Sequence, residues 1–200
     1  PTDITEDVIR EAALCLDLFD DPDAVQAYLR QGTANFLALY DRFDALLKAH
    51  GQPSVSWMDI PVVGRMHIPS CDFATMISTK HFREFVQPWL AAETQAMSHN
   101  VFHMDGKGIA RHLDAVLELS NVQAIQWVQG VGDDLPILQW VPLIRRMQAA
   151  GKGVVVDLDR TELDDFTEAV RPQGIFVCVA SESEEEELVI LKKLDQWGKS

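Results

Sequence analysis

The chain has 200 residues, of which 47% are hydrophobic, so it is long and apolar enough to bury a full core. Its formal net charge of −14 and the lack of a basic stripe argue against nucleic acid as a partner, and no apolar run is long enough to span a membrane. The three cysteines lie far apart and never form a C-x-x-C pair. This cysteine pattern predicts a cytoplasmic protein without a disulfide framework.

The first part of the chain is predicted to be helical. Apolar residues recur at helical spacing over residues 7–19 and again over 23–50, where Gly32 interrupts the pattern. Prolines then limit the chain to loops and short strands, and another helix is expected to begin with Ser78 or Thr79 as its N-cap. Pro88 lies inside that helical pattern, so we expect a kink there.

Strands and helices alternate regularly in the second half of the chain. The predicted strands are 100–105, 122–128, 153–158 and 174–180, and the predicted helices are 108–119, 135–150, 161–170 and 183–197. Short connections between such elements indicate parallel strands that follow one another in chain order, starting from a strand near residues 67–72.

This pattern predicts an α/β fold of the (β/α) TIM-barrel type with parallel strands. A complete barrel typically needs about 250 residues, so we expect an incomplete barrel, a fragment holding the carboxyl-terminal five or so βα units. We expect a single domain over residues 1–200, with 1–50 as a helical lead-in and 51–200 as the βα units. Because an open sheet has unpaired edges, the helices of the lead-in should fold across the open side, or two copies should pair as a homodimer.

The most informative motif is His103-x-Asp105, at the end of a short apolar strand and directly before a glycine turn. Side chains two apart on a strand share a face, so His103 and Asp105 should point the same way at the carboxyl end of their strand. This is where α/β folds place their chemistry, and the pair suggests a metal site or an acid–base pair. The alternative is a buried histidine satisfied by a neighbouring carboxylate. On the helix that follows, we expect His112 and Asp114 to be exposed.

Several other side chains are candidates for the same site. Asp72 follows a predicted strand, at a position compatible with an active-site carboxylate. If Val177 faces the helices, Cys178 faces the interior of the barrel, although a small buried core thiol is the common role of such a cysteine. Aromatic and polar residues near strand ends often line small-molecule pockets. The pocket candidates for substrate binding are Trp57, Asp59, Gln126 and Trp127.

Three segments, taken in order, resemble the uroporphyrinogen decarboxylase superfamily. Residues 70–90 contain an aspartate followed by Ser78-x-x-x-Phe82-x-x-Phe85-x-x-Pro88, similar to the helix start of that family. The strand 101–106 is similar to the next signature, which reads His-x-Cys-Gly in the cobalamin-linked methyltransferases of the family. Residues 123–128 fit the strand that follows. The resemblance covers residues 1–197 and implies an enzyme with its active site at the carboxyl ends of the barrel strands.

The superfamily includes zinc enzymes that move methyl groups between corrinoid proteins and thiols. The resemblance therefore implies methyl transfer or related chemistry on a small organic or corrinoid-linked substrate, with a corrinoid protein as a partner. It implies zinc held by His103, Asp105 and Cys178, although Asp105 stands where the family has a cysteine. The catalytic residues expected are Asp72, His103 and Asp105.

Two alternative functions remain open. The superfamily also includes the cofactor-free enzyme that decarboxylates uroporphyrinogen in tetrapyrrole biosynthesis, in which an aspartate such as Asp72 stabilises a protonated pyrrole. The eight substrate carboxylates would need a cluster of cations, whereas few lie near the predicted strand ends, namely Lys107, Arg111 and Arg65. The other alternative is a non-catalytic barrel fragment or binding module, because the metal-binding pattern is altered.

Overall fold

The computed structural model describes residues 2–199, and their side chains from residue 11 onward. The chain forms two compact units, and each is described by itself. The first unit comprises Pro1–Asn100 and Gly108–Val122, and the second comprises Val101–Lys107 and Gln123–Ser200. No helix within the described residues combines the length and the apolar character that crossing a membrane requires.

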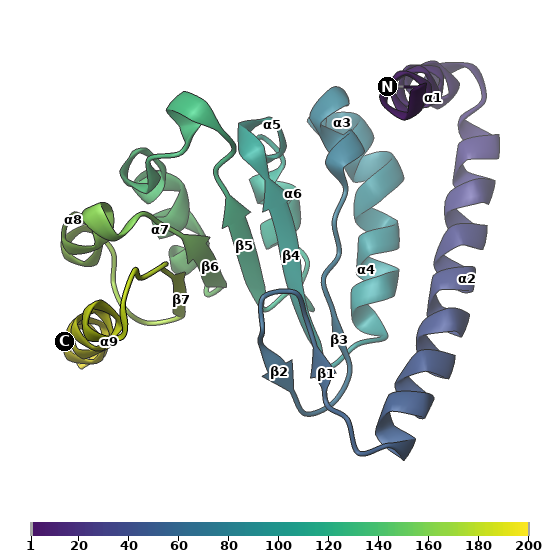
Figure 1. Cartoon of the computed structure of the whole chain (residues 1–200). Coiled ribbons are helices and arrows are strands. Elements are labelled where there is room, and N and C mark those ends of the chain that lie inside the picture. The colour runs from purple at the N-terminus through teal and green to yellow at the C-terminus, as the bar shows by residue number, and fades with distance from the viewer. Residues whose placement is uncertain (1, 200) are drawn as a thin grey trace. The chain divides into compact units, whose positions relative to one another are not determined.

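The first unit begins with the two helices that the sequence predicts, α1 (Thr2–Asp20) and α2 (Pro22–Ala49). Asp21 lies between them and caps α2, because its carboxylate accepts a hydrogen bond from the Ala24 N–H at 3.1 Å. Helix α2 runs through Gly32 without a break and packs along helix α4 (Figure 1).

Short strands follow α2. Strands β1 (Ser54–Val55) and β2 (Pro61–Val62) form an antiparallel pair, and β3 (Met66–His67) pairs in parallel with the start of β4 (His99–Asp105). The strand predicted near residues 67–72 is therefore shorter and begins earlier. Pro69, which cannot donate to a ladder, follows β3, and the chain turns into the 3₁₀ helix η1 (Asp72–Met76).

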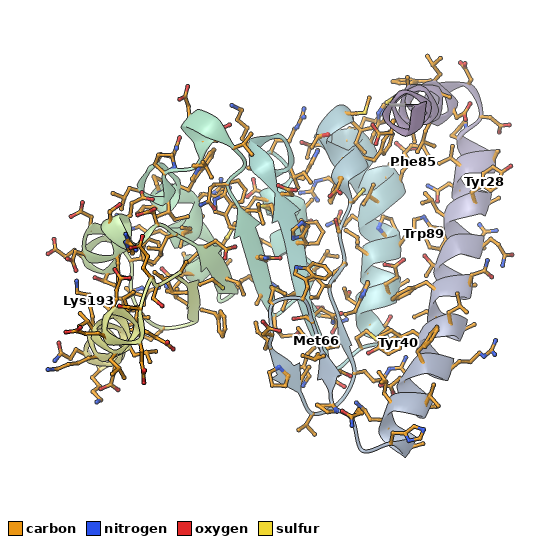
Figure 2. All side chains as sticks on the ribbon, viewed as in Figure 1. Tyr28, Tyr40, Met66, Phe85, Trp89 and Lys193 are labelled. Carbon is orange, nitrogen blue, oxygen red and sulfur yellow. The ribbon has the colours of Figure 1, made fainter. Side chains whose placement is uncertain are left out.

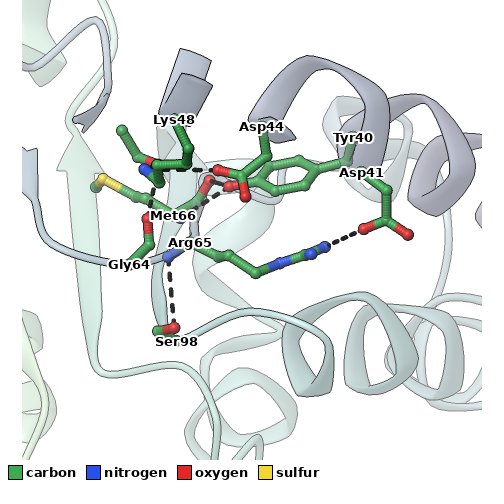
Figure 3. Close-up of polar contacts among 9 residues, drawn as sticks. Tyr40, Asp41, Asp44, Lys48, Gly64, Arg65, Met66 and Ser98 are labelled. Carbon is green, nitrogen blue, oxygen red and sulfur yellow. Dashed lines mark hydrogen bonds and ion pairs between the residues drawn. The ribbon is translucent and has the colours of Figure 1, made fainter. Parts of the chain in front are cut away.

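Helix α2 provides hydrogen-bond partners for the backbone of β3 (Figure 3). The Tyr40 hydroxyl donates to the Met66 carbonyl at 2.8 Å and accepts from the Met66 N–H at 2.9 Å. Arg65 lies over the Tyr40 ring and binds Asp41 at 2.7 Å, so the same turn of α2 is held by a second contact. Both backbone groups of Met66 are thereby satisfied by a helix.

The helix predicted from Ser78 begins there, since the Ser78 hydroxyl accepts a hydrogen bond from the His81 N–H at 3.2 Å. It is assembled from α3 (Thr79–His81), the π-helical turn η2 (Phe82–Val86) and α4 (Gln87–Gln95). Pro88 lies in the first turn of α4, directly after η2. Because proline lacks an N–H and its ring crowds the carbonyl four residues before it, the wider turn accommodates Pro88 inside the helical run.

The helix predicted over 108–119 is divided into α5 (Gly106–Ala110) and α6 (Leu113–Leu117). His112 lies between them, and the expectation that it is exposed was wrong, because its side chain is fully buried. Its ring stacks on Phe82 with the centroids 4.5 Å apart, and its Nε2 hydrogen-bonds the Ala74 carbonyl at 2.9 Å. Burial lowers the pKa of His112, so the neutral form is favoured in the core of this unit.

The second unit is built from parallel strands and helices in alternation. Its remaining strands are β5 (Ala124–Val128), β6 (Gly153–Asp157) and β7 (Ile175–Cys178). Its longer helices are α7 (Val141–Ala149), α8 (Leu163–Ala169) and α9 (Glu184–Gly198), and its short 3₁₀ turns are η3 (Gly132–Asp134), η4 (Ile137–Trp140) and η5 (Arg160–Glu162). The strand order β3-β4-β5-β6-β7 is parallel throughout, which confirms the predicted α/β class and the predicted order along the chain (Figure 1).

The two faces of the strands in the second unit differ in polarity. One face carries large apolar side chains that are fully or almost fully buried, namely Phe102, Met104, Ile125, Trp127, Val154 and Val156. Trp127 packs on Trp140 of η4 with ring centroids 4.9 Å apart. The opposite face is polar toward the carboxyl ends of the strands, and it holds four of the eight candidate site residues, namely His103, Asp105, Gln126 and Cys178.

Candidate functional site

Polar side chains from several strands share one face of the second unit. The ladders pair His103 with Gln126 and Asp157 with Cys178. The register of the β5–β6 ladder places Gln126 and Asp157 on the same face of the strands. Because side chains two apart on a strand point the same way, Asp105 joins this group. We call this set, His103, Asp105, Gln126, Asp157 and Cys178, the polar face.

His103 is held in a defined orientation by its neighbour on the next strand. Its Nδ1 lies 2.8 Å from Gln126 Oε1. An amide oxygen can only accept a hydrogen bond, so His103 Nδ1 carries the proton of this bond and the lone pair of the neutral ring is on Nε2. The His103 side chain retains 20% of its exposure, which leaves the ring accessible to a small molecule.

Asp105 lies beside the other ring nitrogen of the same histidine. Its Oδ2 is 4.0 Å from His103 Nε2, and its side chain is half exposed. This separation is longer than a hydrogen bond, so the carboxylate acts on the ring through its charge. The His103-x-Asp105 spacing therefore places an imidazole and a carboxylate side by side on one face of the strand, as the sequence predicts.

Cys178 is a neutral thiol at the other end of the polar face. Burial raises its pKa to about 11, and the charge of Asp157 on the neighbouring strand, which accepts a hydrogen bond from the thiol, raises it further in the same direction. Since the thiolate is the reactive form, this cysteine is a weak nucleophile near neutral pH.

The arrangement does not fit the zinc site that the resemblance implies. Ligands of one zinc ion all lie about 2.0–2.3 Å from the metal. His103 and Asp105 share β4, whereas Cys178 lies on β7, beyond β5 and β6, which places it roughly 14 Å away along the sheet at about 4.8 Å per strand. Among the side chains that the structure describes, those of residues 11–199, no group of three or more His, Cys, Asp or Glu is placed to hold a metal ion.

Trp127 does not join the polar face, contrary to the convergence that the sequence predicts. It pairs in register with Met104 and therefore points to the opposite face of the strands. Its side chain is fully buried. The prediction failed because Trp127 directly follows Gln126, and neighbouring residues of a strand face opposite ways. Trp127 is a core residue, whereas Gln126 contacts His103.

The remaining predicted site residues, Asp72, Trp57 and Asp59, belong to the first unit. Asp72 is exposed at the start of η1, and its Oδ1 accepts a hydrogen bond from the Ser70 hydroxyl at 2.9 Å. Trp57 is 62% exposed in the turn between β1 and β2. Asp59 closes that turn with a φ of 54°, a left-handed conformation that aspartate tolerates better than most residues.

Sequence reasoning overlooked Asp157. It ends the apolar strand Val154–Val156 just as Asp105 ends its own strand, and an acidic residue directly after a buried run was the available signal. With Asp105 and Asp157 on the same side, the polar face has a negative character.

The cations that could hold an anionic substrate are already engaged within their own units. Lys107 forms an ion pair with Asp134 at 2.8 Å. Arg65 binds Asp41 at 2.7 Å, and Arg111 donates to backbone carbonyl oxygens. These contacts leave the acidic polar face poorly suited to a polyanion.

The chain was compared with known proteins, and no family model, curated protein or solved structure matches it.

Proposed function

We propose that this chain is an enzyme that transfers a methyl group to a small organic thiol, with His103 as the general base. The observation that carries the proposal is the hydrogen bond between His103 Nδ1 and Gln126 Oε1 at 2.8 Å, which directs the lone pair on Nε2 away from Gln126 and toward the side of Asp105. The type of reaction comes from the resemblance of residues 70–128 to the uroporphyrinogen decarboxylase superfamily.

In the proposed step, the thiol proton moves to His103 Nε2 as the sulfur attacks the methyl carbon. A carbon–sulfur bond forms, and the bond between the methyl group and its donor breaks with both electrons remaining on the donor. A positioned general base typically contributes about 10²–10⁴-fold to such a rate. Asp105 then stabilises the imidazolium, and Gln126 keeps the ring in place throughout.

The methyl donor proposed is a corrinoid, free or carried by a partner protein, as the resemblance suggests. No metal step is included, because His103, Asp105 and Cys178 do not lie together. The parallel strands β3–β7 are compatible with part of a TIM-type barrel, in which the carboxyl ends of the strands would form the active site. Such an enzyme would act in the cytoplasm. The homodimer expected from the open edges of the sheet remains a prediction.

Decarboxylation of uroporphyrinogen is disfavoured by the charges of the site. A substrate with eight carboxylates needs unpaired cations, whereas Lys107 is paired with Asp134 and the polar face itself carries Asp105 and Asp157. Bringing a polyanion to two carboxylates without compensating cations is unfavourable.

The test uses the full chain with methylcobalamin as the donor and mercaptoethanol as the acceptor. Loss of the methylcobalamin absorption is followed, and the methyl thioether is identified by mass spectrometry. We expect His103→Gln to slow transfer by about 10²-fold or more and Asp105→Asn to have a smaller effect. His50→Gln, at an exposed histidine after α2, is the matched control and should leave the rate unchanged.

Two results would contradict this proposal. If the wild-type chain forms no thioether above the uncatalysed rate with a panel of small thiols, the methyl-transfer proposal fails and the binding-module alternative is favoured. If thioether forms but His103→Gln transfers at the wild-type rate, the polar face is not where the reaction occurs.

A further inference from the structure

The first unit contains a cavity of about 440 Å³, a volume within the range of small-molecule sites. Its walls come from α1, from the first half of α2 and from the segment that runs from Ser70 to Glu93. Most of the lining is apolar, and Figure 2 shows Tyr28 on α2 with Phe85 and Trp89 on the opposing helical segment. This cavity is built from residues of the first unit alone, whereas the polar face belongs to the second unit.

The polar groups of the cavity gather at one end. Thr33 Oγ1 donates to Glu93 Oε1 at 3.1 Å, and the Glu93 charge also acts on the Cys71 thiol. Glu93 Oε2 lies 3.5 Å from His67 Nε2. Val25 precedes Thr33 by eight residues on α2. Phe85 likewise precedes Glu93 by eight residues on the helical run of η2 and α4. Since Gln26 contacts Glu84 and Trp89 while Thr33 contacts Glu93, α2 and α4 run side by side in the same direction.

The cavity is therefore elongated, with an apolar end and a carboxylate end. Eight residues separate Val25 from Thr33 on α2, which corresponds to about 12 Å along the helix axis. Cys71 adds no charge, because burial raises its pKa to about 11. Glu93 is the charged residue among the lining residues, its side chain is 21% exposed, and a carboxylate can only accept hydrogen bonds.

Gly32 keeps one wall of this cavity open. It lies in the middle of α2, where glycine destabilises a helix by about 0.5–1 kcal/mol relative to alanine. A Cβ added at Gly32 would meet nothing within 4 Å, so close packing does not explain the glycine. Gly32 lines the cavity, and open space lies beside the position that a Cβ would take.

We propose that this cavity binds a small molecule with an apolar body and a cationic, hydrogen-bond-donating head, such as an alkylamine. The apolar walls bury the body, and the head donates to the Glu93 carboxylate, whose oxygens have capacity beyond the bond from Thr33. A ligand with a carboxylate head would meet the charge of Glu93, and the residues that line the cavity include neither lysine nor arginine to compensate.

The test compares three probes of equal chain length that differ only in the head group: octylamine, octanol and octanoate. Binding to the full chain is measured by titration calorimetry below the concentrations at which the probes aggregate. We expect octylamine to bind most tightly, octanol next, and octanoate at least about tenfold more weakly than octylamine. Equal affinities, or tighter octanoate binding, would overturn the assignment of the head group.

Two substitutions locate the site. Gly32→Leu should fill the cavity and abolish binding of all three probes, while thermal unfolding shows the chain to be as stable as wild type or more so. Gly198→Leu places the same side chain at another helical glycine with open space around it and should leave binding unchanged. Unaltered binding to Gly32→Leu would show that the probes bind elsewhere.

Glu93→Gln keeps an acceptor at the polar end but removes the charge, so it tests the proposal even if Gly32→Leu folds poorly. We expect octylamine to lose its advantage over octanol, while octanol affinity stays within about twofold. An advantage for octylamine that persists in Glu93→Gln would rule out Glu93 as the partner of the head group. Failure of the wild-type chain to bind octylamine or octanol would overturn the proposal entirely.

Discussion

The polar face of the second unit and the cavity of the first unit use similar side chains in opposite surroundings. Each has a cysteine whose pKa is raised to about 11, mainly by burial, and each has a nearby carboxylate, Asp157 beside Cys178 and Glu93 beside Cys71. In the cavity the walls are apolar, whereas the polar face adds an accessible histidine, His103.

This contrast shows that residue type alone does not define a functional site. Glu93 is positioned by Thr33 at the end of an apolar cavity, which suits recognition of a charged head group. His103 is oriented by Gln126 and stays partly exposed beside Asp105, which suits proton transfer. We therefore propose binding for the cavity of the first unit and chemistry for the polar face of the second.

The largest expected effect separates the two faces of the strands in the second unit. Trp127→Ala removes a fully buried side chain that packs on Trp140 and should lower the free energy of unfolding by about 3–5 kcal/mol. His103→Gln, on the polar face, should change it by less than about 1 kcal/mol. Urea unfolding measures both, and equal losses would contradict the assignment of the two faces.

A second prediction concerns His112, the buried histidine that follows β4 in the sequence. His112 has a lowered pKa because it is buried, so the unfolded state binds its proton more readily than the folded state. Its contribution to stability is complete above about pH 6.5 and is lost as the pH falls toward the lowered folded value. In His112→Phe, which retains a ring to stack on Phe82, urea unfolding should become less sensitive to acid between about pH 7 and about pH 5. If urea unfolding of His112→Phe depended on pH as in the wild-type chain, the buried His112 would not be the cause of the sensitivity to acid.

Gly32→Ala sharpens the description of the cavity. The substitution should raise the free energy of unfolding by about 0.5–1 kcal/mol, because alanine favours a helix and the added Cβ meets no neighbour. Thermal unfolding provides the measurement. A loss of stability would indicate that this part of α2 is packed more tightly than the structure shows.

The smallest effect concerns the two thiols. Asp157→Asn removes a charge that helps to raise the pKa of Cys178, so alkylation of Cys178 by iodoacetamide should become a few-fold faster near neutral pH. Cys71 in the cavity, which Asp157 does not influence, is the internal control. Peptide mass spectrometry follows both rates, and a parallel rise at the two cysteines would point to general loosening of the fold instead.

Much of the backbone pattern could be predicted, because alternating apolar runs and helical periodicity are local signals. The strand order and the facing of His103 and Asp105 follow from period two and short connections. Trp127 lies near the carboxyl end of its strand, as predicted for a site residue, but it faces the core because it directly follows Gln126 on the strand. His112 was misplaced because its burial depends on Phe82 and Ala74, far away in the sequence.

The cavity could not be predicted for a similar reason. Its walls combine residues 14–33 with residues 70–93, and each segment alone shows only the spacing of an amphipathic helix or a loop. Gly32 was the one local signal. Gly32 interrupts the helical pattern of the sequence, whereas in the structure α2 continues through it and leaves space beside the helix.

The central claim is that Gln126 fixes His103 with its proton on Nδ1, so that Nε2 is the basic nitrogen beside Asp105. Two-dimensional ¹H–¹⁵N NMR of the histidine side chains, with His103 assigned by its loss in His103→Gln, reports which ring nitrogen is protonated in the neutral form. The structure predicts the Nδ1–H form in the wild-type chain and a shift toward Nε2–H in Gln126→Leu. A wild-type His103 that carries its proton on Nε2 would contradict the proposed general base.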